Sequence, residues 1–474
     1  MEKKGKIPPP SFRELLALAL PMIASQASET IMQFVDRLFL SRFGKLSIAA
    51  SMSGGLSTFV FTAFFAGTVG YTNAVVAQYF GAHRKERCIE TTAQGIYLSL
   101  LFTPLLLPLI PLVHRLFFLL GHSPEQVALE FAYFRILMFG AVFILLRQTL
   151  VGFFLGIGQS KLVMVANFIG MFVNIPFNYV LIFGKLGFPA LGIRGAALGT
   201  VAGSATIFMI LLFFYLHHGF YIEYAHGKRW KLRLDLMRRL LRFGTPAGSE
   251  LFLNVFGFNL FVQLMHSMGP DVAAAVTITF NYDMVAFVPM IGLGIAVTSL
   301  VGRQMGGGNP EGARQATFLA LRVGYSYAAV MMGVFVFGAG PLVALFAGGL
   351  GPEDGSLVLL AESMLRLAAI YTLADITQLV FSGALRGAGD TKVTMYISVS
   401  MHWFLGIASY ILIRILGVGP LRMWVLFIAF VVVLGVLVFL RFHSGRWAEI
   451  RVIEEEDILP EVHQPEVKTE AKWM

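Results

Sequence analysis

Carboxylates and amides occupy one face of the first hydrophobic segment of the sequence. Gln26, Glu29, Gln33 and Asp36 are spaced i, i+3, i+7 and i+10, so an α-helix would place them in one stripe. Ionisable groups at membrane depth cost about 2.5–3.5 kcal/mol. Such a stripe therefore does not face lipid, and it must face water or other polar groups. The chemistry that these side chains offer there is the binding of a proton or a cation.

Four other hydrophobic segments carry polar side chains at positions where they are costly. In one of them Tyr371, Asp375, Gln378 and Ser382 step by four, three and four along one helix face. The others hold Asn167, Asn174 and Asn178, then Glu250 and Asn254, and then Asn281 and Asp283. Candidates for coupling to a proton or cation are Asp36, Asp375, Glu29, Glu250 and Asp283, and candidates for the polar wall of a substrate cavity are Gln26, Gln33, Asn174, Asn178, Asn254, Asn281, Tyr371 and Gln378.

Each of these side chains also has a purely structural interpretation. Asn and Gln often only join helices within a bundle, at about 0.6 kcal/mol each. Glu250 and Asp283 would be structural if each formed an ion pair with a basic residue. Asp36 precedes Arg37 near one end of its segment, so it is also compatible with a surface carboxylate. The sequence alone leaves these alternatives open.

Four prolines lie inside hydrophobic segments rather than at their ends: Pro21, Pro176, Pro246 and Pro289. Each one removes a backbone hydrogen bond and permits a kink. Bent helices beside a polar face suit a protein that alternates between two shapes, although prolines that only assist packing would give the same pattern. We predict that these four positions bend their helices.

The composition is that of a membrane protein. The chain has 474 residues, of which 57% are hydrophobic and 13% charged, and its mean hydropathy is +0.75. Soluble domains are about 45–50% apolar and about 25% charged. Apolar runs of roughly 20 residues, enough to cross a bilayer, fill most of the length and do not alternate as barrel strands would. The net charge of +9 is spread over short loops, which argues against a nucleic-acid partner and favours the lipid bilayer as the surroundings.

Landmarks of the first half recur in the second half at two similar spacings. Pro21 is as far from Pro246 as Gly81 is from Gly306, and we call this distance along the chain the shorter repeat spacing. The glycine loop at 155–161 recurs at 386–392, which defines the longer repeat spacing. Gaps between apolar runs give twelve candidate spans. We therefore predict an all-α polytopic membrane protein with twelve transmembrane helices in two six-helix halves, related by a pseudo-two-fold axis along the membrane normal.

Basic residues set the predicted orientation. Alternate loops are rich in Lys and Arg, and the positive-inside rule places this set, with both termini, in the cytoplasm. We expect a monomeric, multi-pass protein of the inner (plasma) membrane. The predicted regions are a cytoplasmic N-terminal segment 1–14, a first half 15–218, a basic cytoplasmic linker 219–242, a second half 243–441 and a disordered cytoplasmic tail 442–474.

Several motifs resemble those of the multidrug and toxic compound extrusion (MATE) transporters, over roughly residues 11–441. The first segment, ending in Phe34-Val35-Asp36, resembles the opening helix of that family with its membrane aspartate. The most specific match runs from Asn174-Ile175-Pro176-Phe177-Asn178 to Gly195-Ala196-Ala197. Residues 371–375 with Leu385-Arg386-Gly387 are similar to the tenth helix of the family. The asparagine pair and Asp375 are more similar to the NorM-like branch than to the DinF branch.

The resemblance implies secondary active antiport by alternating access. It implies export of bulky, often cationic and aromatic organic compounds in exchange for H⁺ or Na⁺, with no other cofactor and no metal site. Asp36, Asn174, Asn178 and Asp375 match family positions implicated in cation or substrate binding. One position departs from the NorM-like pattern, because Asn254 stands where those members carry a glutamate. Either Glu250, one turn earlier, replaces that glutamate, or this part of the cation site is lost.

Two other functions are compatible with a chain of this kind. A lipid-linked saccharide flippase of the same superfamily would line its cavity with several arginines, and Arg135, Arg147 and Arg366 are the candidates within spans. A membrane-embedded enzyme would need a metal set or a nucleophile–base pair, and the sequence contains neither His-x-x-Glu-His nor Gly-x-Ser-x-Gly. We therefore expect a transporter rather than an enzyme.

Overall fold

Helices dominate the described part of the chain. The computed structural model describes residues 8–119, 121–217, 230–347 and 355–454, and no strand occurs within these ranges. Ten of the described helices are long and apolar enough to cross a membrane, and one pair bent by 47° forms an eleventh candidate span. A further helix, α10 (Leu234–His266), is 33 residues long and is apolar only after its charged first turns. These elements make up the twelve spans expected from the sequence.

The first half holds six spans. They are α1 (Phe12–Ser41), α2 (Lys45–Gly70) continued by α3 (Thr72–Gly81), the bent pair α4 (Lys85–Leu106) and α5 (Leu109–Leu119), α6 (Pro124–Gly156), α7 (Ser160–Phe183) and α8 (Ile193–His217). The second half holds α10, α11 (Pro270–Gly306), α12 (Pro310–Ala347), α13 (Gly355–Ala388), α14 (Thr391–Tyr410) continued by the π-helical turn η2 (Ile411–Ile415), and α15 (Pro420–His443). A short 3₁₀ turn, η3 (Arg446–Glu449), follows α15.

Helix boundaries repeat at the two spacings seen in the sequence. The ends of α1 and α10 are separated by the shorter repeat spacing, as are the ends of α3 and α11, and the starts of α7 and α14 are separated by the longer one. Packing repeats as well, since α1 packs on α7 of its own half and on α11 of the other, while α10 packs on α14 and on α2. The first helix of each half thus packs on a helix of its own half and on a helix of the other half, and we call α1 and α10 the exchanged helices. Two parallel halves related by a pseudo-two-fold axis produce this pattern. The predicted fold class is therefore confirmed.

The first helix of each half begins inside the core of the other half. Leu15 and Leu18 of α1 are buried in the apolar cluster of the second half, whereas Leu240 and Phe243 of α10 are buried in the cluster of the first half. Leu15 and Leu240 are separated by the shorter repeat spacing, so they are equivalent positions of the repeat. The two halves are therefore interlocked at the end of the molecule where these helices start.

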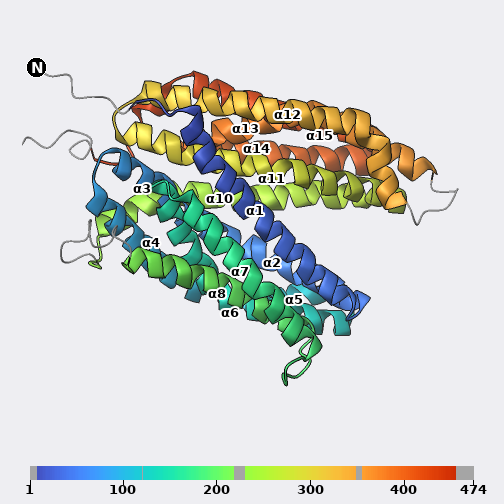
Figure 1. Ribbon diagram of the computed structural model, residues 1–474. Coiled ribbons are helices and arrows are strands. Elements are labelled where there is room, and N and C mark those ends of the chain that lie inside the picture. Colours follow the sequence, from blue (N-terminus) through green and yellow to red (C-terminus); the bar gives the residue numbers. More distant parts are fainter. Residues whose placement is uncertain (1–7, 120, 218–229, 348–354, 455–474) are drawn as a thin grey trace, which may run out of the picture.

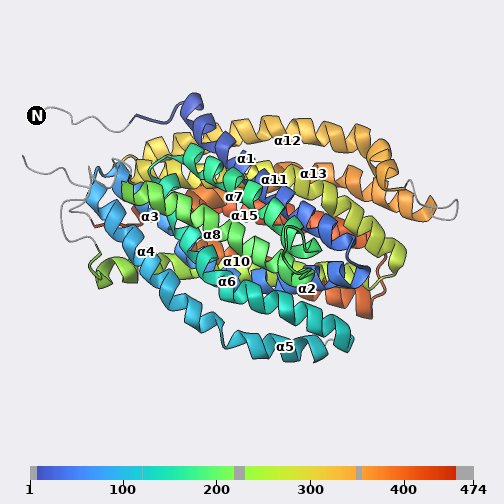
Figure 2. The ribbon, with the colours of Figure 1, turned by 60° about the horizontal axis from the view of Figure 1, so that its bottom comes forward.

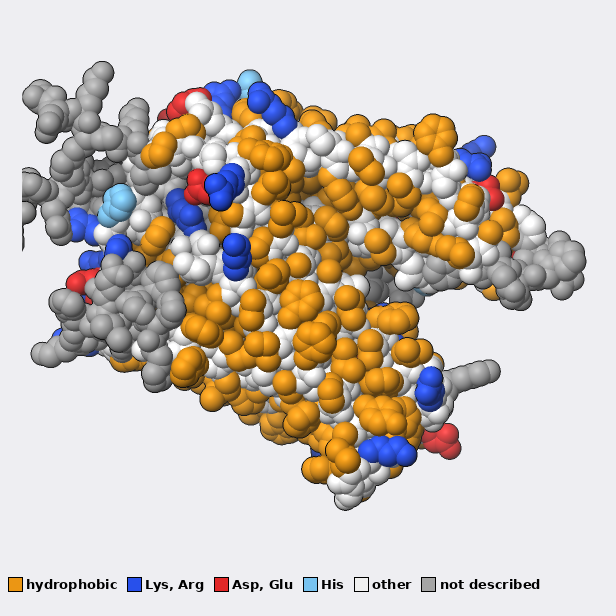
Figure 3. Space-filling view, in the orientation of Figure 1, with side chains coloured by type: hydrophobic (Ala, Val, Ile, Leu, Met, Phe, Trp, Pro, Cys, Tyr) orange, Lys and Arg blue, Asp and Glu red, His pale blue; other side chains and the backbone are white. Residues whose placement is uncertain are grey.

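The halves meet at one end of the bundle and separate at the other (Figure 1). We call the meeting end, with the turns at 82–84, 157–159, 307–309 and 389–390, the linker end. The opposite end, with the turns at 42–44, 184–192, 267–269 and 416–419, is the open end. A notch between the halves is visible at the open end in Figure 3, and Figure 2 shows α5 and α12 at opposite edges of the molecule.

Two regional boundaries differ from those predicted. The helix α10 begins at Leu234, so the end of the expected linker is helical, and residues 218–229 lie outside the described residues. Within the tail expected to be disordered, the segment 444–454 is folded, with Val452 and Ile453 almost fully buried. In the sequence, the acidic residues that follow this apolar pair led to the prediction of a polar, disordered tail. Residues 455–474 lie outside the described part of the chain.

The four prolines lie inside helices, as the sequence indicates. Pro21 is in α1, Pro176 in α7, Pro246 in α10 and Pro289 in α11. Pro21 and Pro246 occupy equivalent positions in the two exchanged helices. Their role in bending stays a prediction.

Candidate functional site

A buried carboxylate joins three helices of the first half. Asp36 of α1 is only 7% exposed, and it accepts hydrogen bonds from Asn178 Nδ2 on α7 and from Thr200 Oγ1 on α8, the latter at 3.3 Å. Asn178 Nδ2 also lies 3.2 Å from Asn174 Oδ1, one turn earlier on α7. Asp36 is thus not a surface carboxylate. We call Asp36, Asn174, Asn178 and Thr200 the first-half site.

Register between α1 and α7 explains why these residues meet. Asn167 of α7 donates a hydrogen bond to Ser25 of α1, and the Asn178–Asp36 contact follows at the same interval along both helices. That interval is about three helical turns, or about 16 Å. Two polar contacts at equal spacing mean that α1 and α7 run parallel and side by side. Asn167 therefore joins two helices, which is the purely structural interpretation given to the asparagines from the sequence.

The first-half site has uncommitted polar atoms. Asn178 Oδ1 and Asn174 Nδ2 are buried without a hydrogen-bond partner among the described residues. A carboxylate beside a free amide oxygen presents the oxygen ligands that hard cations prefer, and the carboxylate alone can accept a proton. No three His, Cys, Asp or Glu side chains in the described part of the chain lie close enough to hold a metal ion. The groups that this site offers can accept a proton or contact a cation.

A glycine permits the close approach of α8. A Cβ atom at Gly199 would lie 1.8 Å from Asn178 Oδ1, which is far inside van der Waals contact. We expect Gly199→Ala to displace the Asn178 side chain from Asp36, to destabilise the protein by about 1–3 kcal/mol and to reduce transport. Thermal unfolding in detergent and transport assays would measure both effects.

The matched control is Gly333→Ala in α12, where nothing lies within 4 Å of the added atom. Equal behaviour of the Gly199 and Gly333 variants would show that the Asn178 position is not important.

Glu29 has its own partner in the first half. Its carboxylate lies 3.1 Å from Arg147 Nη1 on α6, and both side chains are partly buried. Gln26 is half-buried and Gln33 is exposed on the same helix. The stripe seen in the sequence therefore divides, since Glu29 pairs across to α6 while Asp36 contacts α7 and α8.

Two acidic side chains of the second half lie near one another. Tyr371 of α13 is buried and its hydroxyl donates to Asp283 Oδ1 of α11 at 3.1 Å. Asp375, one turn further along α13, is close enough to Asp283 for the two carboxylates to repel each other. Aromatic rings of α15 surround Tyr371, including Phe427 at a centroid distance of 5.3 Å. We call Asp283, Tyr371 and Asp375 the second-half cluster.

Other predicted residues lie outside this cluster. Gln378 donates to Ser382 on its own helix at 3.3 Å. Asn281 is exposed and donates to the Thr277 carbonyl of its own helix. Asn281 and Asp283 are two residues apart, and on an α-helix this spacing points their side chains to different faces of α11. The structure therefore does not bring Asn281 to the cluster.

Glu250 forms an ion pair instead of joining Asp375. Its carboxylate lies 2.8 Å from Arg386 Nη2 of α13, and Glu250 is 1% exposed. Asn254 donates to Ser398 Oγ of α14 at 2.7 Å. The structure thus places Glu250 with a basic partner, which was the structural alternative for this residue.

Sequence reasoning did not identify Thr200 or the pairing of Arg147 with Glu29. A threonine in an apolar helix carries no charge that would mark it. Arg147 stood out only as an arginine within a span, and nothing in the sequence indicates which acidic residue it would meet.

Equivalent side chains close the linker end. Gln78 of α3 donates to the Gly387 carbonyl at 2.8 Å, and Arg303 of α11 donates to the Gly156 carbonyl at 3.2 Å. Gln78 and Arg303 are separated by the shorter repeat spacing and the two glycines by the longer one, so these contacts are related by the repeat. Both join one half to the other. The glycine loops that revealed the duplication therefore belong to the contact between the halves.

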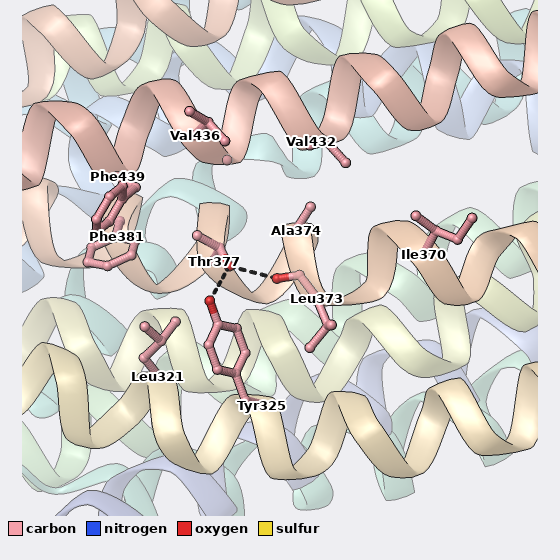
Figure 4. A pocket seen from close by; sticks show the side chains of 11 residues that line it. Leu321, Tyr325, Ile370, Leu373, Ala374, Thr377, Phe381, Val432, Val436 and Phe439 are labelled. Carbon is pink, nitrogen blue, oxygen red and sulfur yellow. Dashed lines mark hydrogen bonds between the residues drawn. The ribbon is translucent and has the colours of Figure 1, made fainter.

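A groove of about 400 Å³ lies between α12, α13 and α15 (Figure 4). Its lining is apolar apart from Tyr325 and Thr377, whose hydroxyls are hydrogen-bonded at 2.8 Å. It uses a face of α13 different from the face that carries Tyr371 and Asp375. The groove therefore lacks the charged groups of the two sites.

Comparison with known proteins agrees with this architecture. The sequence model of the MatE family matches residues 21–180 and 246–411, so the chain belongs to the MatE family. Members of this family are multi-pass membrane transporters and not enzymes. The assignment to the NorM-like branch stays a prediction.

Solved structures show the same fold. One is an outward-facing conformation of a multidrug resistance MATE family transporter of the MOP superfamily, with a TM-score of 0.83, 20% identity and coverage of 92% of this chain and 96% of that chain. A MOP superfamily transporter from Pyrococcus furiosus Vc1 (DSM3638) has a TM-score of 0.82, 20% identity and coverage of 93% and 97%. A MATE in complex with MaL6 has a TM-score of 0.83, 20% identity and coverage of 92% and 97%.

Proposed function

We propose that the protein is a secondary active multidrug antiporter that exports bulky organic compounds in exchange for H⁺ or Na⁺ by alternating access. The observation that carries the proposal is the first-half site, where one buried carboxylate holds α7 and α8 against α1. A group with this geometry can link ion binding to helix packing. The multidrug resistance transporter of similar fold supports the substrate class.

Ion binding at Asp36 changes the contacts of three helices. As a carboxylate, Asp36 accepts hydrogen bonds from Asn178 and Thr200. Protonation turns one of its oxygens into a donor, so it can no longer accept both bonds in the same way. A bound Na⁺ would instead draw the Asp36 oxygens and the free Asn178 Oδ1 towards itself. Either ion therefore rearranges the α1, α7 and α8 contacts, which is the step that coupling requires.

The second-half cluster supplies the recognition of organic cations. Asp283 and Asp375 repel each other unless a proton or cation lies between them. Aromatic rings beside Tyr371 add the faces that attract cationic and aromatic compounds. Two acidic sites, one per half, would admit two ions for each exported cation. Such a cycle moves net charge, and each elementary charge gains about 2.3 kcal/mol per 100 mV.

Orientation follows from the basic loops of the linker end. Arg84, Lys85 and Arg233 are at this end, and the positive-inside rule favours the cytoplasm for an end that carries such residues. We propose that both termini are cytoplasmic, that the protein is a monomer in the inner (plasma) membrane, and that this conformation opens to the outside.

The flippase alternative is less well supported. Arg147 is paired with Glu29, Arg366 with Glu362 at 2.8 Å, and the Arg135 guanidinium lies over the Phe131 ring. These arginines are on α6 and α13 and do not form one group. A pyrophosphate carrier would need them to converge.

Dye efflux from drug-sensitive cells tests the proposed function. Cells that express the protein are loaded with cationic dyes, and the proton and sodium gradients are then collapsed separately. We expect faster efflux than in cells without the protein, and loss of that efflux when one of the two gradients is collapsed. Efflux equal to that of control cells for the whole dye panel would contradict the proposal.

A further inference from the structure

The segment after α15 is anchored in both halves at the linker end. The chain turns at Gly445, which has φ of +72°, and Trp447 then stacks on Phe442 at 4.8 Å in the apolar cluster of the second half. A few residues later, Val452 and Ile453 are 1% and 2% exposed in the cluster that holds most of the first half. We call residues 446–454 the terminal bridge.

Polar contacts add to these apolar anchors. Tyr79 of α3 donates its hydroxyl to Glu454 Oε2 at 3.0 Å. Arg239 of α10 pairs with the other oxygen of Glu454 and donates to the Val452 carbonyl. Tyr79 and the start of α10 both lie in the apolar cluster of the first half, so Glu454 strengthens the attachment of the terminal bridge to that half, while Trp447 attaches it to the second.

The terminal bridge covers a glycine of the second half whose equivalent in the first half is covered by an arginine. The equivalent glycines Gly158 and Gly389 both have positive φ, +84° and +99°. The Arg303 guanidinium covers Gly158, where a Cβ atom would lie 2.1 Å from Nη2. The residue equivalent to Arg303 is Gln78, which is shorter and ends at the Gly387 carbonyl.

Gly389 is covered instead by the terminal bridge. A Cβ atom at Gly389 would lie 2.2 Å from Val452 Cγ2. The side chain of Val452 therefore takes the position on one side of the axis that a guanidinium takes on the other. This correspondence distinguishes the bridge from a tail that lies on the surface by chance.

We infer that the terminal bridge is a latch that holds the linker end closed and must release before that end opens. The inference rests on the alternating access of the proposed function. Opening the linker end breaks the Gln78–Gly387 and Arg303–Gly156 contacts. It also separates the two apolar clusters that hold Trp447 and Val452, the two ends of the terminal bridge. Contacts made only in the closed state favour that state by their full contribution.

Distance measurements between spin labels test the latch without a transport assay. One label pair replaces Lys161 and Lys392, exposed and equivalent residues at the linker end, and a second pair replaces Lys185 and Leu416 in loops of the open end. Both pairs are placed in a Cys88→Ala background, since Cys88 is the single cysteine of the sequence.

Two bridge variants and one control are compared by pulsed electron spin resonance. In Val452→Ala/Ile453→Ala and in Glu454→Gln we expect the population with a longer linker-end distance and a shorter open-end distance to rise by at least about threefold. The control is Glu449→Gln, an exposed carboxylate of the same segment, which should leave both distributions unchanged. The Glu454→Gln variant retains the apolar anchors, so its result does not depend on whether the double variant folds.

The outcomes separate the latch from the proposed function. In the labelled protein without bridge substitutions, the label pairs should exchange between two distances when the pH, the Na⁺ concentration or the dye concentration is changed. If they never do, alternating access itself is wrong. If they exchange but neither bridge variant changes the populations, the latch is wrong and the proposed function is unaffected.

Discussion

Replacing Asp36 with Asn is expected to abolish ion-driven export and its dependence on pH and Na⁺. Asparagine keeps the shape of the side chain but neither titrates nor carries charge. It has one acceptor oxygen, so the bonds from Asn178 and Thr200 cannot both be kept as they are. Hydrogen bonds to charged groups contribute about 1.5–3 kcal/mol each. Efflux rates at several pH values and Na⁺ concentrations would measure the effect.

The control for this variant is Asp271→Asn at the start of α11, where the carboxylate is exposed. It removes the same charge from the same protein and should leave export unchanged. Wild-type export by the Asp36 variant at every pH and Na⁺ concentration would remove this residue from the mechanism.

Replacing Asp375 with Asn is expected to abolish export while leaving expression and folding near normal. The change removes one of two neighbouring carboxylates, so an organic cation at the second-half cluster loses half of its negative partners. Binding of a cationic dye should weaken about tenfold, which corresponds to about 1.4 kcal/mol. Dye binding to purified protein and efflux from cells would report the two parts of this prediction.

Glu362→Gln is the matched control, because Glu362 is on the same helix and pairs with Arg366 away from the cluster. Asp375→Asn with normal dye affinity and normal export would show that the second-half cluster is structural.

The repeat explains the scaffold but not the chemistry. The positions equivalent to Asp36 and Asn174 are Phe261 and Leu405, and the position equivalent to Asp375 is Ile144. Asp36 and Asp375 therefore stand at positions where the other half carries an apolar residue. This asymmetry supports different tasks for the two halves, with ion coupling alone at the first-half site and substrate recognition, besides a second ion, at the second-half cluster.

Much of the fold was predictable because a duplicated sequence repeats its helix ends. The shorter and longer repeat spacings place the turns of both halves and explain the exchanged packing of α1 and α10. Helical periodicity likewise indicates that Asp36 and Asp375 avoid lipid. What periodicity cannot supply is the neighbour across a helix interface, which depends on packing depth and rotation.

Glu250 shows this limit most clearly. From the sequence it was either a substitute for the glutamate absent at Asn254 or one member of an ion pair. Only the packing of α10 on α13 determines that Arg386 is within 2.8 Å. The terminal bridge was missed for a related reason, since two apolar residues before an acidic run give no periodic signal.

Transport by purified protein in liposomes tests coupled antiport most directly. An H⁺ or Na⁺ gradient is imposed across liposomes that contain a cationic dye on both sides at equal concentration. Our account predicts that the dye accumulates against its own gradient when one of these ions flows the other way, and that Asp36→Asn abolishes this accumulation. Dye concentrations that stay equal on the two sides, whichever ion gradient is imposed, would contradict coupled antiport.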